Sequence, residues 1–159
     1  MSIKDWIGET TEYDKKLALE VKKPKSWCKS VSAFANTAGG TLIFGITDGE
    51  EIVGLEDIKS DSEFISQKIK EKISPFPEVT MKLHKTENEK ELLLLHVPAG
   101  AETPYYYTGD GVTEAYIRIG NESVVADATE LKRLVMRGRK SSYDSLMSPY
   151  NLRTFLSVS

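Results

Sequence analysis

The spacing of apolar residues along the chain predicts alternating strands and helices. Residues 12–19 alternate apolar and polar side chains, which is typical of a strand, although Lys15 falls on the apolar side. Residues 26–38 are expected to form a helix with Ser26 as its N-cap. Residues 41–47 form a continuous apolar run, which indicates a strand that is buried on both faces.

The middle of the chain continues this alternation. Asp48 and Gly49 form a turn signal, and residues 51–55 are expected to return as a hairpin partner. A helix is predicted over residues 60–73, where apolar residues recur at helical spacing. Two prolines that follow this segment end the helix.

The last third of the chain combines strands with a final helix. Residues 79–84 and 91–97 are predicted to form a hairpin, and residues 98–111 a loop rich in glycine, proline and tyrosine. Residues 114–119 alternate as a strand. Asp127 is expected to cap the final helix. No clear pattern is found after Gly138.

These elements predict an α/β fold, in the form of a mixed α+β sheet with flanking helices. A chain of 159 residues with 40% hydrophobic content is long enough for one domain with its own core. We expect this domain to cover residues 1–138. Residues 139–159 are interpreted as a linker or as the start of a truncated C-terminal region.

Composition excludes several classes of protein. The single cysteine, Cys28, rules out an intramolecular disulfide framework and is interpreted as a buried thiol. No apolar run approaches the roughly 20 residues that a membrane span requires. The first residues, MSIKDW, contain no hydrophobic signal core, so we expect a cytoplasmic protein without a membrane partner.

Charge is distributed unevenly, although the net charge is only −3. One basic group lies in the first 30 residues, and a second lies in the final helical segment. The first group consists of Lys15, Lys16, Lys22, Lys23, Lys25 and Lys29, and the second of Lys132, Arg133, Arg137, Arg139 and Lys140. Such segregation can create a basic face on a mildly acidic protein, although each group could also be ordinary solvated surface.

The most distinctive segment is SAFANTAGGTLIFGITDG, residues 32–49. An apolar helix reaches Asn36 and then a Gly39-Gly40 pair, and a short strand follows at once. Asn and Gly tolerate the left-handed backbone that ends many helices. The strand then leads to Asp48, so this glycine corner is interpreted as a candidate site.

The chain resembles the Schlafen AlbA-like family, also called the divergent AAA or DNA-binding family. The resemblance rests on GETTEYDKK, on AFANTxGGxLxxGxxD followed by VGL, on the TPYYY loop and on AYIRIGNESVVAD, and it covers about residues 8–137. It implies an α/β fold and a surface that binds nucleic acid. It also implies the N-terminal module of a larger bacterial transcriptional regulator, with a covalently attached C-terminal domain.

The main hypothesis is therefore a module that binds DNA or RNA without a cofactor. Cationic side chains would neutralise phosphates, and polar groups of the glycine corner would add hydrogen bonds. The predicted contacts are Lys15, Lys16, Lys22, Lys23, Lys25, Lys29, Asn36, Thr37, Gly39, Gly40 and Arg118. A helix C-terminus repels anions, so glycine amides or lysines would hold the phosphate.

Aromatic residues offer a second type of contact. Tyr105, Tyr106 and Tyr107 could stack on single-stranded bases if they are exposed, or anchor their loop if they are buried. Alternation favours burial for most of them. Trp27 carries the same two alternatives, of which the core is favoured.

The resemblance also implies an alternative, because some Schlafen proteins are metal-dependent endoribonucleases that use three carboxylates. In this sequence the motif falls on Glu9, Asp14 and Asp48, with Lys16 beside the scissile phosphate. Three carboxylates could hold Mg²⁺ or Mn²⁺, which would activate a water molecule. A second alignment on residues 19–22 keeps a glutamate and a lysine but loses the first acid.

Two further possibilities concern partners. ATP binding by this segment is not expected, because the chain has no GxxxxGK[ST] loop and its Gly pair follows a helix. A dimerisation or interaction domain, with a possible homodimer, remains a third alternative. The sequence does not distinguish DNA from RNA.

Overall fold

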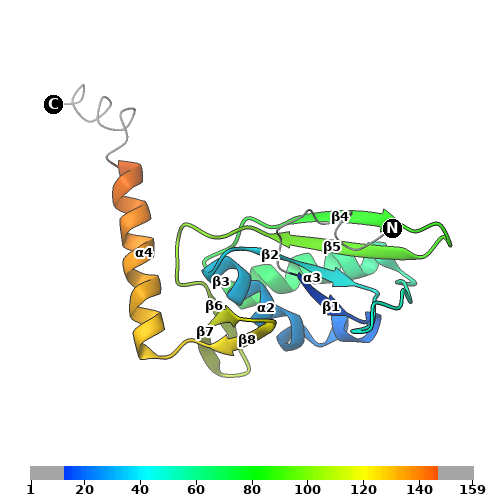
Figure 1. Ribbon diagram of the computed structural model, residues 1–159, viewed down its shortest axis with the longest axis horizontal. Helices are drawn as coiled ribbons and strands as arrows, with labels where there is room; N and C mark the ends of the chain where they lie inside the picture. Colours follow the sequence, from blue (N-terminus) through cyan, green and yellow to red (C-terminus); the bar gives the residue numbers. More distant parts are fainter. Residues whose placement is uncertain (1–12, 147–159) are drawn as a thin grey trace.

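The computed structural model describes residues 13–146, which form two four-stranded sheets with flanking helices (Figure 1). The first sheet has the order β1-β2-β5-β4, with β1 Tyr13–Lys16, β2 Gly40–Phe44, β5 Glu91–Val97 and β4 Thr80–Lys85. The second has the order β3-β6-β7-β8, with β3 Ile73–Ser74, β6 Tyr106–Gly109, β7 Val112–Ile119 and β8 Glu122–Val125. The helices are the 3-10 helix η1 Ala18–Lys22, α2 Pro24–Asn36, α3 Ile58–Lys72 and α4 Ala128–Leu146. The predicted mixed α/β class is confirmed.

The first sheet is mixed because β1 runs parallel to β2, whereas β2, β5 and β4 pair antiparallel. Strand β2 is buried along its whole length, as its apolar run predicts. Strand β1 lies at the edge of this sheet, with Asp14 opposite Leu42. Its polar side chains can therefore reach both α2 and the loop after β2.

Helix α2 links the two sheets through the largest apolar cluster. Trp27 and Phe34 of α2 are fully buried, and the Trp27 ring packs edge-on against Phe44 of β2 with 5.8 Å between ring centroids. The same cluster includes side chains from β5, α3, β6 and β7. Cys28 is buried in this core, as predicted.

Helix α4 begins at a side-chain cap, as predicted. Asp127 Oδ1 accepts a hydrogen bond of 2.8 Å from the backbone N–H of Glu130. Leu134 then packs against Ala115 and Ile117 of β7. The C-terminal end of α4 extends past the sheets (Figure 1). Among the described helices, none is both long and apolar enough to cross a membrane.

Several predicted element boundaries were wrong. The first strand ends at Lys16 and is followed by η1, because the Glu20 carboxylate accepts from the N–H of Leu17 and turns the chain. The predicted partner strand 51–55 is reduced to an isolated bridge between Ile46 and Ile52. Strands β6 and β8 were not predicted. Helix α4 crosses the expected boundary at Gly138, and the assignment of 139–159 as a linker stays a prediction.

Candidate nucleic-acid interface

The glycine corner is closed by neighbouring chain. Gly39 has a φ of +83°, and its N–H donates to the Phe34 carbonyl at 2.9 Å. A Cβ on Gly39 would lie 3.0 Å from the backbone of Val97 and Ala99, and a Cβ on Gly40 would lie 2.5 Å from the Phe34 ring. Both glycines are buried. Packing therefore requires them, and their predicted contact with phosphate is corrected.

Asn36 is also committed to the interior. Its Nδ2 donates to the carbonyls of Tyr105 and Tyr116 at 2.9 and 2.8 Å, and its Oδ1 accepts from the N–H of Tyr105 at 2.7 Å. These bonds attach the end of α2 to the second sheet, so Asn36 is a structural residue and not a ligand contact. Thr37 is partly exposed, and its hydroxyl donates to the Ala33 carbonyl at 2.7 Å. Its hydrogen is therefore not free for a phosphate.

The candidate stacking aromatics are mostly buried. Trp27, Tyr105 and Tyr107 are almost fully enclosed, and Tyr106 is partly exposed. The Tyr107 hydroxyl donates to Asp110 at 3.0 Å, and burial, together with this bond, raises the pKa of Tyr107 to about 12. The favoured interpretation of these residues as anchors is confirmed for those three.

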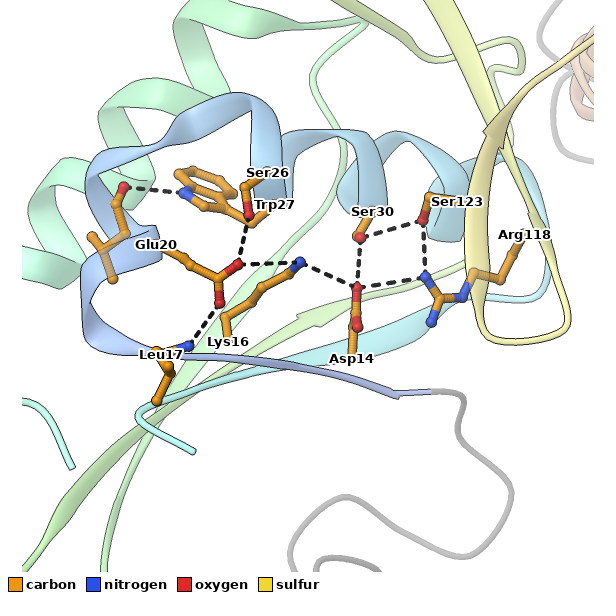
Figure 2. Close-up of polar contacts among 10 residues, drawn as sticks. Asp14, Lys16, Leu17, Glu20, Ser26, Trp27, Ser30, Arg118 and Ser123 are labelled. Carbon is orange, nitrogen blue, oxygen red and sulfur yellow. Dashed lines mark hydrogen bonds and ion pairs between the residues drawn. The ribbon is translucent and has the colours of Figure 1, made fainter. Parts of the chain in front are cut away.

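A chain of alternating charges lies between β1, α2 and β7 (Figure 2). Asp14 Oδ2 lies 3.5 Å from Arg118 Nη1 and 3.9 Å from Lys16 Nζ, and it accepts from the Ser30 hydroxyl at 2.7 Å. Lys16 Nζ also lies 3.9 Å from Glu20. The side chains of Lys16 and Arg118 are only 13% and 5% exposed. Both cations balance internal carboxylates, so neither is a free surface cation, and their contact with nucleic acid stays a prediction.

The two described members of the proposed metal triad lie on opposite sides of β1. Asp14 faces α2, whereas the next residue, Lys15, donates from Nζ to the Asp48 carbonyl at 2.6 Å and lies 4.0 Å from Glu50. Glu9 lies outside the described residues. Within residues 13–146, no three His, Cys, Asp or Glu side chains group to hold a metal. Asp14 and Asp48 do not form this site by themselves, and the Mg²⁺ or Mn²⁺ site with Glu9 stays a prediction; Lys15 is paired internally.

The remaining lysines lie at the end of η1, along the first half of α2 and at the end of α3. We define the α2 lysine cluster as Lys22, Lys23, Lys25, Lys29 and Lys72. Lys23, Lys25 and Lys72 line one cavity of about 170 Å³ together with Asp110, whose carboxylate accepts from the Tyr107 hydroxyl. Lys22 Nζ lies over the Phe64 ring, 4.1 Å from its centroid. Within the described chain, no carboxylate lies within ion-pair distance of these five lysines. Sequence reasoning missed Lys72, because only the fold brings the end of α3 to this position.

The residues of the second basic group belong to helix α4. Lys132, Arg139 and Lys140 are exposed, and Arg133 is exposed but bonded to Glu130 at 2.8 Å. Arg137 Nη1 donates to the Asn36 carbonyl at 2.9 Å and so covers the C-terminal end of α2. Arg137 of this group therefore lies at the C-terminal end of α2, opposite the end at which Lys23 caps the helix.

Comparisons with known proteins agree with this architecture. The family model described as "Schlafen, AlbA_2" matches residues 8–127. The chain is similar to a solution NMR structure from Nitrosomonas europaea, the N-terminal domain of a protein whose name relates it to the ATP-dependent DNA helicase RecG. The two are 26% identical with a TM-score of 0.53, and the match covers 79% of this chain and 90% of that one. No curated protein matches the chain.

Proposed function

Because the chain belongs to the Schlafen AlbA_2 family, we propose that it is a DNA-binding module that holds phosphates with the α2 lysine cluster. The observation that carries this proposal is the set of five lysines at the end of η1, along the first half of α2 and at the end of α3, none of which forms an ion pair with a carboxylate of residues 13–146. Lysines without a close carboxylate are available to an external anion, and Asp110 is one opposing charge in the cavity that three of them line.

The N-terminus of α2 adds to this positive potential. Its cap residue, Lys23, provides no side-chain acceptor, and the helix begins with Pro24. The first N–H groups of a helix and its dipole favour negative charge at this end. The lysines thus surround the end of the helix that attracts anions, whereas the glycine corner lies at the end that repels them.

Contacts of this kind give affinity without sequence preference. Each phosphate that a lysine neutralises releases condensed counterions, so binding weakens as salt increases. DNA is proposed as the ligand because the similar Nitrosomonas europaea protein has a name related to a DNA helicase. The same proposal makes this module part of a cytoplasmic bacterial transcriptional regulator with a covalently attached C-terminal domain. The possible homodimer also stays a prediction.

A charge-removal experiment tests the proposal. Fluorescence anisotropy with a labelled duplex at low salt would compare the wild-type chain with a Lys23→Gln/Lys25→Gln variant. We expect the variant to bind at least about tenfold more weakly, because two phosphate contacts are lost. Lys82→Gln/Lys85→Gln, which removes two exposed charges from β4, is the matched control and should bind like the wild type. Equal affinities of all three proteins would contradict the proposal.

A further inference from the structure

A second cationic feature lies at the other end of α2. A cavity of about 330 Å³ is bounded by the end of α2, by β7 and by α4. Its charged lining consists of Arg118, Arg133 and Arg137 against one carboxylate, Glu130. We call this cavity the arginine pocket. Three arginines from two separate elements, opposed by one glutamate, make it electropositive.

Arg118 contributes charge that water cannot screen. Its side chain is 5% exposed and lies over the Phe34 ring, 4.9 Å from the centroid, and among residues 13–146 only Nη1 is paired, with Asp14 and Ser123. Nε and Nη2 are buried and have no hydrogen-bond partner in this described part of the chain. A buried guanidinium with one balanced side leaves positive potential on the other, and that potential is stronger in a low-dielectric environment.

Arg137 removes the main physical objection to an anion at this position. The C-terminal end of a helix normally repels negative charge. Arg137 donates to the carbonyls of Asn36, Ala35 and Gly100 at 2.9, 3.5 and 3.3 Å, which offsets the negative end of α2. Its Nε has no acceptor among the described residues.

Arg133 supplies the accessible donors. Its side chain is 72% exposed, and within the described part of the chain only Nη1 is bonded, to Glu130 at 2.8 Å. Nε and Nη2 remain available for the paired hydrogen bonds that guanidinium groups form with phosphate oxygens. Glu130 weakens the pocket by its charge but also fixes the orientation of Arg133.

We propose that the arginine pocket binds one phosphate group of the DNA, with Arg133 as its direct donor; this inference rests on the proposed function. The pocket and the α2 lysine cluster lie at the two ends of a helix of 13 residues, which is about 20 Å long. A strand that engages both must span that length.

Inorganic phosphate tests the pocket without DNA. In ¹H–¹⁵N NMR spectra, phosphate should cause saturable shifts at Thr37, Arg133 and Arg137, and chloride at equal ionic strength should not. Arg133→Gln should weaken phosphate binding about tenfold, as expected for a lost charge-assisted hydrogen bond. Glu130→Gln should strengthen it about twofold, because an opposing exposed charge is removed.

Lys132→Gln is the matched control, because it removes the same charge from the neighbouring residue of α4, which does not line the pocket. It should change phosphate affinity less than about twofold. An equal loss in Lys132→Gln and Arg133→Gln, or shifts that are identical in chloride, would overturn the inference.

Duplexes with and without a 5′-phosphate identify the source of the group. If the 5′-phosphate strengthens binding only when Arg133 is present, the pocket holds a terminal phosphate. If Arg133→Gln weakens both duplexes equally, and more than Lys132→Gln does, the pocket holds a backbone phosphate.

If Arg133→Gln weakens binding of neither duplex, the inference fails while DNA binding by the α2 lysine cluster stands. If the wild type binds no duplex, the proposed function fails, and the inference, which concerns a phosphate of the DNA, fails with it. The inorganic phosphate titration would then still report whether the pocket takes the free ion.

Discussion

Asn36 shows how one residue can change its interpretation once the fold is known. In the sequence it is a polar residue beside two glycines, which suits a ligand site. In the structure its amide bonds to backbone groups of Tyr105 and Tyr116, which lie 69 and 80 positions away in the chain. Partners at that separation cannot be found from local patterns. The residue type was informative, but its role depends on tertiary contacts.

Replacement of Asn36 should therefore lower the stability of the fold. Asn36→Ala removes the four hydrogen bonds of this side chain and leaves the buried N–H of Tyr105 without its acceptor, although the Tyr105 carbonyl keeps the bond from the Ser32 hydroxyl. We expect the free energy of unfolding, measured by urea denaturation, to fall by about 3 kcal/mol. Asn88→Ala, at an exposed position, is the control and should be near neutral. A loss below about 1 kcal/mol for Asn36→Ala would refute the structural role.

Cys28 predicts how stability changes at alkaline pH. Burial raises the pKa of the Cys28 thiol from 9.0 to about 12, while Lys72 and Lys68 act in the opposite direction. The unfolded chain releases this proton at lower pH than the folded chain does. The stability that the protonated Cys28 thiol contributes to the folded state is therefore fully present below pH 9 and is lost as pH increases towards 12.

The free energy of unfolding should decline from about pH 9 upwards, by an amount on the order of a few kcal/mol. Buried Tyr107 and Tyr116, whose pKa values are also raised to about 12, add to the decline above pH 10. Urea denaturation across this range would measure it. Cys28→Ala should flatten the part that begins at pH 9, and identical slopes for the two proteins would exclude a role for the thiol.

At the scale of elements, helix and strand types were predicted better than their ends. The segments that became α2, β2, α3 and the β4–β5 pair carry strong periodic patterns, and they were found. Strand β6 was missed because proline, glycine and tyrosine in its segment indicate a loop, whereas its pairing with β7 decides its conformation. Asp14 and Lys15 point to opposite faces of β1, and only the fold shows that Lys15, and not Asp14, lies beside Asp48.

One close contact between helix α4 and the rest of the fold is made at Gly138 and the loop that contains Thr103. The Thr103 hydroxyl donates to the Leu134 carbonyl at 2.5 Å. A Cβ at Gly138 would overlap the Thr103 carbonyl oxygen. The absence of a side chain at Gly138 lets the helix lie against this loop.

Gly138→Ala should consequently destabilise the protein. In an exposed helix the change would stabilise by up to about 1 kcal/mol, but here the overlap should reverse the sign and cost about 1–3 kcal/mol. Thermal unfolding and limited proteolysis of α4 would measure the effect. Thr129→Ala, on the exposed first turn of α4, is the control and should be neutral or slightly stabilising. A more stable Gly138→Ala protein would disprove the contact.

At the scale of the whole molecule, the distribution of charge decides the functional interpretation. The net charge is only −3, but the first 30 residues of the sequence contain a group of closely spaced lysines. In the fold, carboxylates and carbonyls pair with Lys15, Lys16 and Arg118, so none of the three is an unpaired cation on the surface. Lys22, Lys23, Lys25, Lys29 and Lys72, which form the α2 lysine cluster, have no ion-pair partner within the described chain. Sequence proximity therefore identified the region, but only the fold separated structural from available cations.

The salt dependence of duplex binding tests the central claim most directly. The logarithm of the association constant should fall linearly with the logarithm of the salt concentration. The magnitude of that slope should decrease by about two in Lys23→Gln/Lys25→Gln, because each lost phosphate contact removes about 0.9 from it. Lys82→Gln/Lys85→Gln should keep the wild-type slope. A slope that is the same in all three proteins, or no binding at low salt, would contradict phosphate recognition by the α2 lysine cluster.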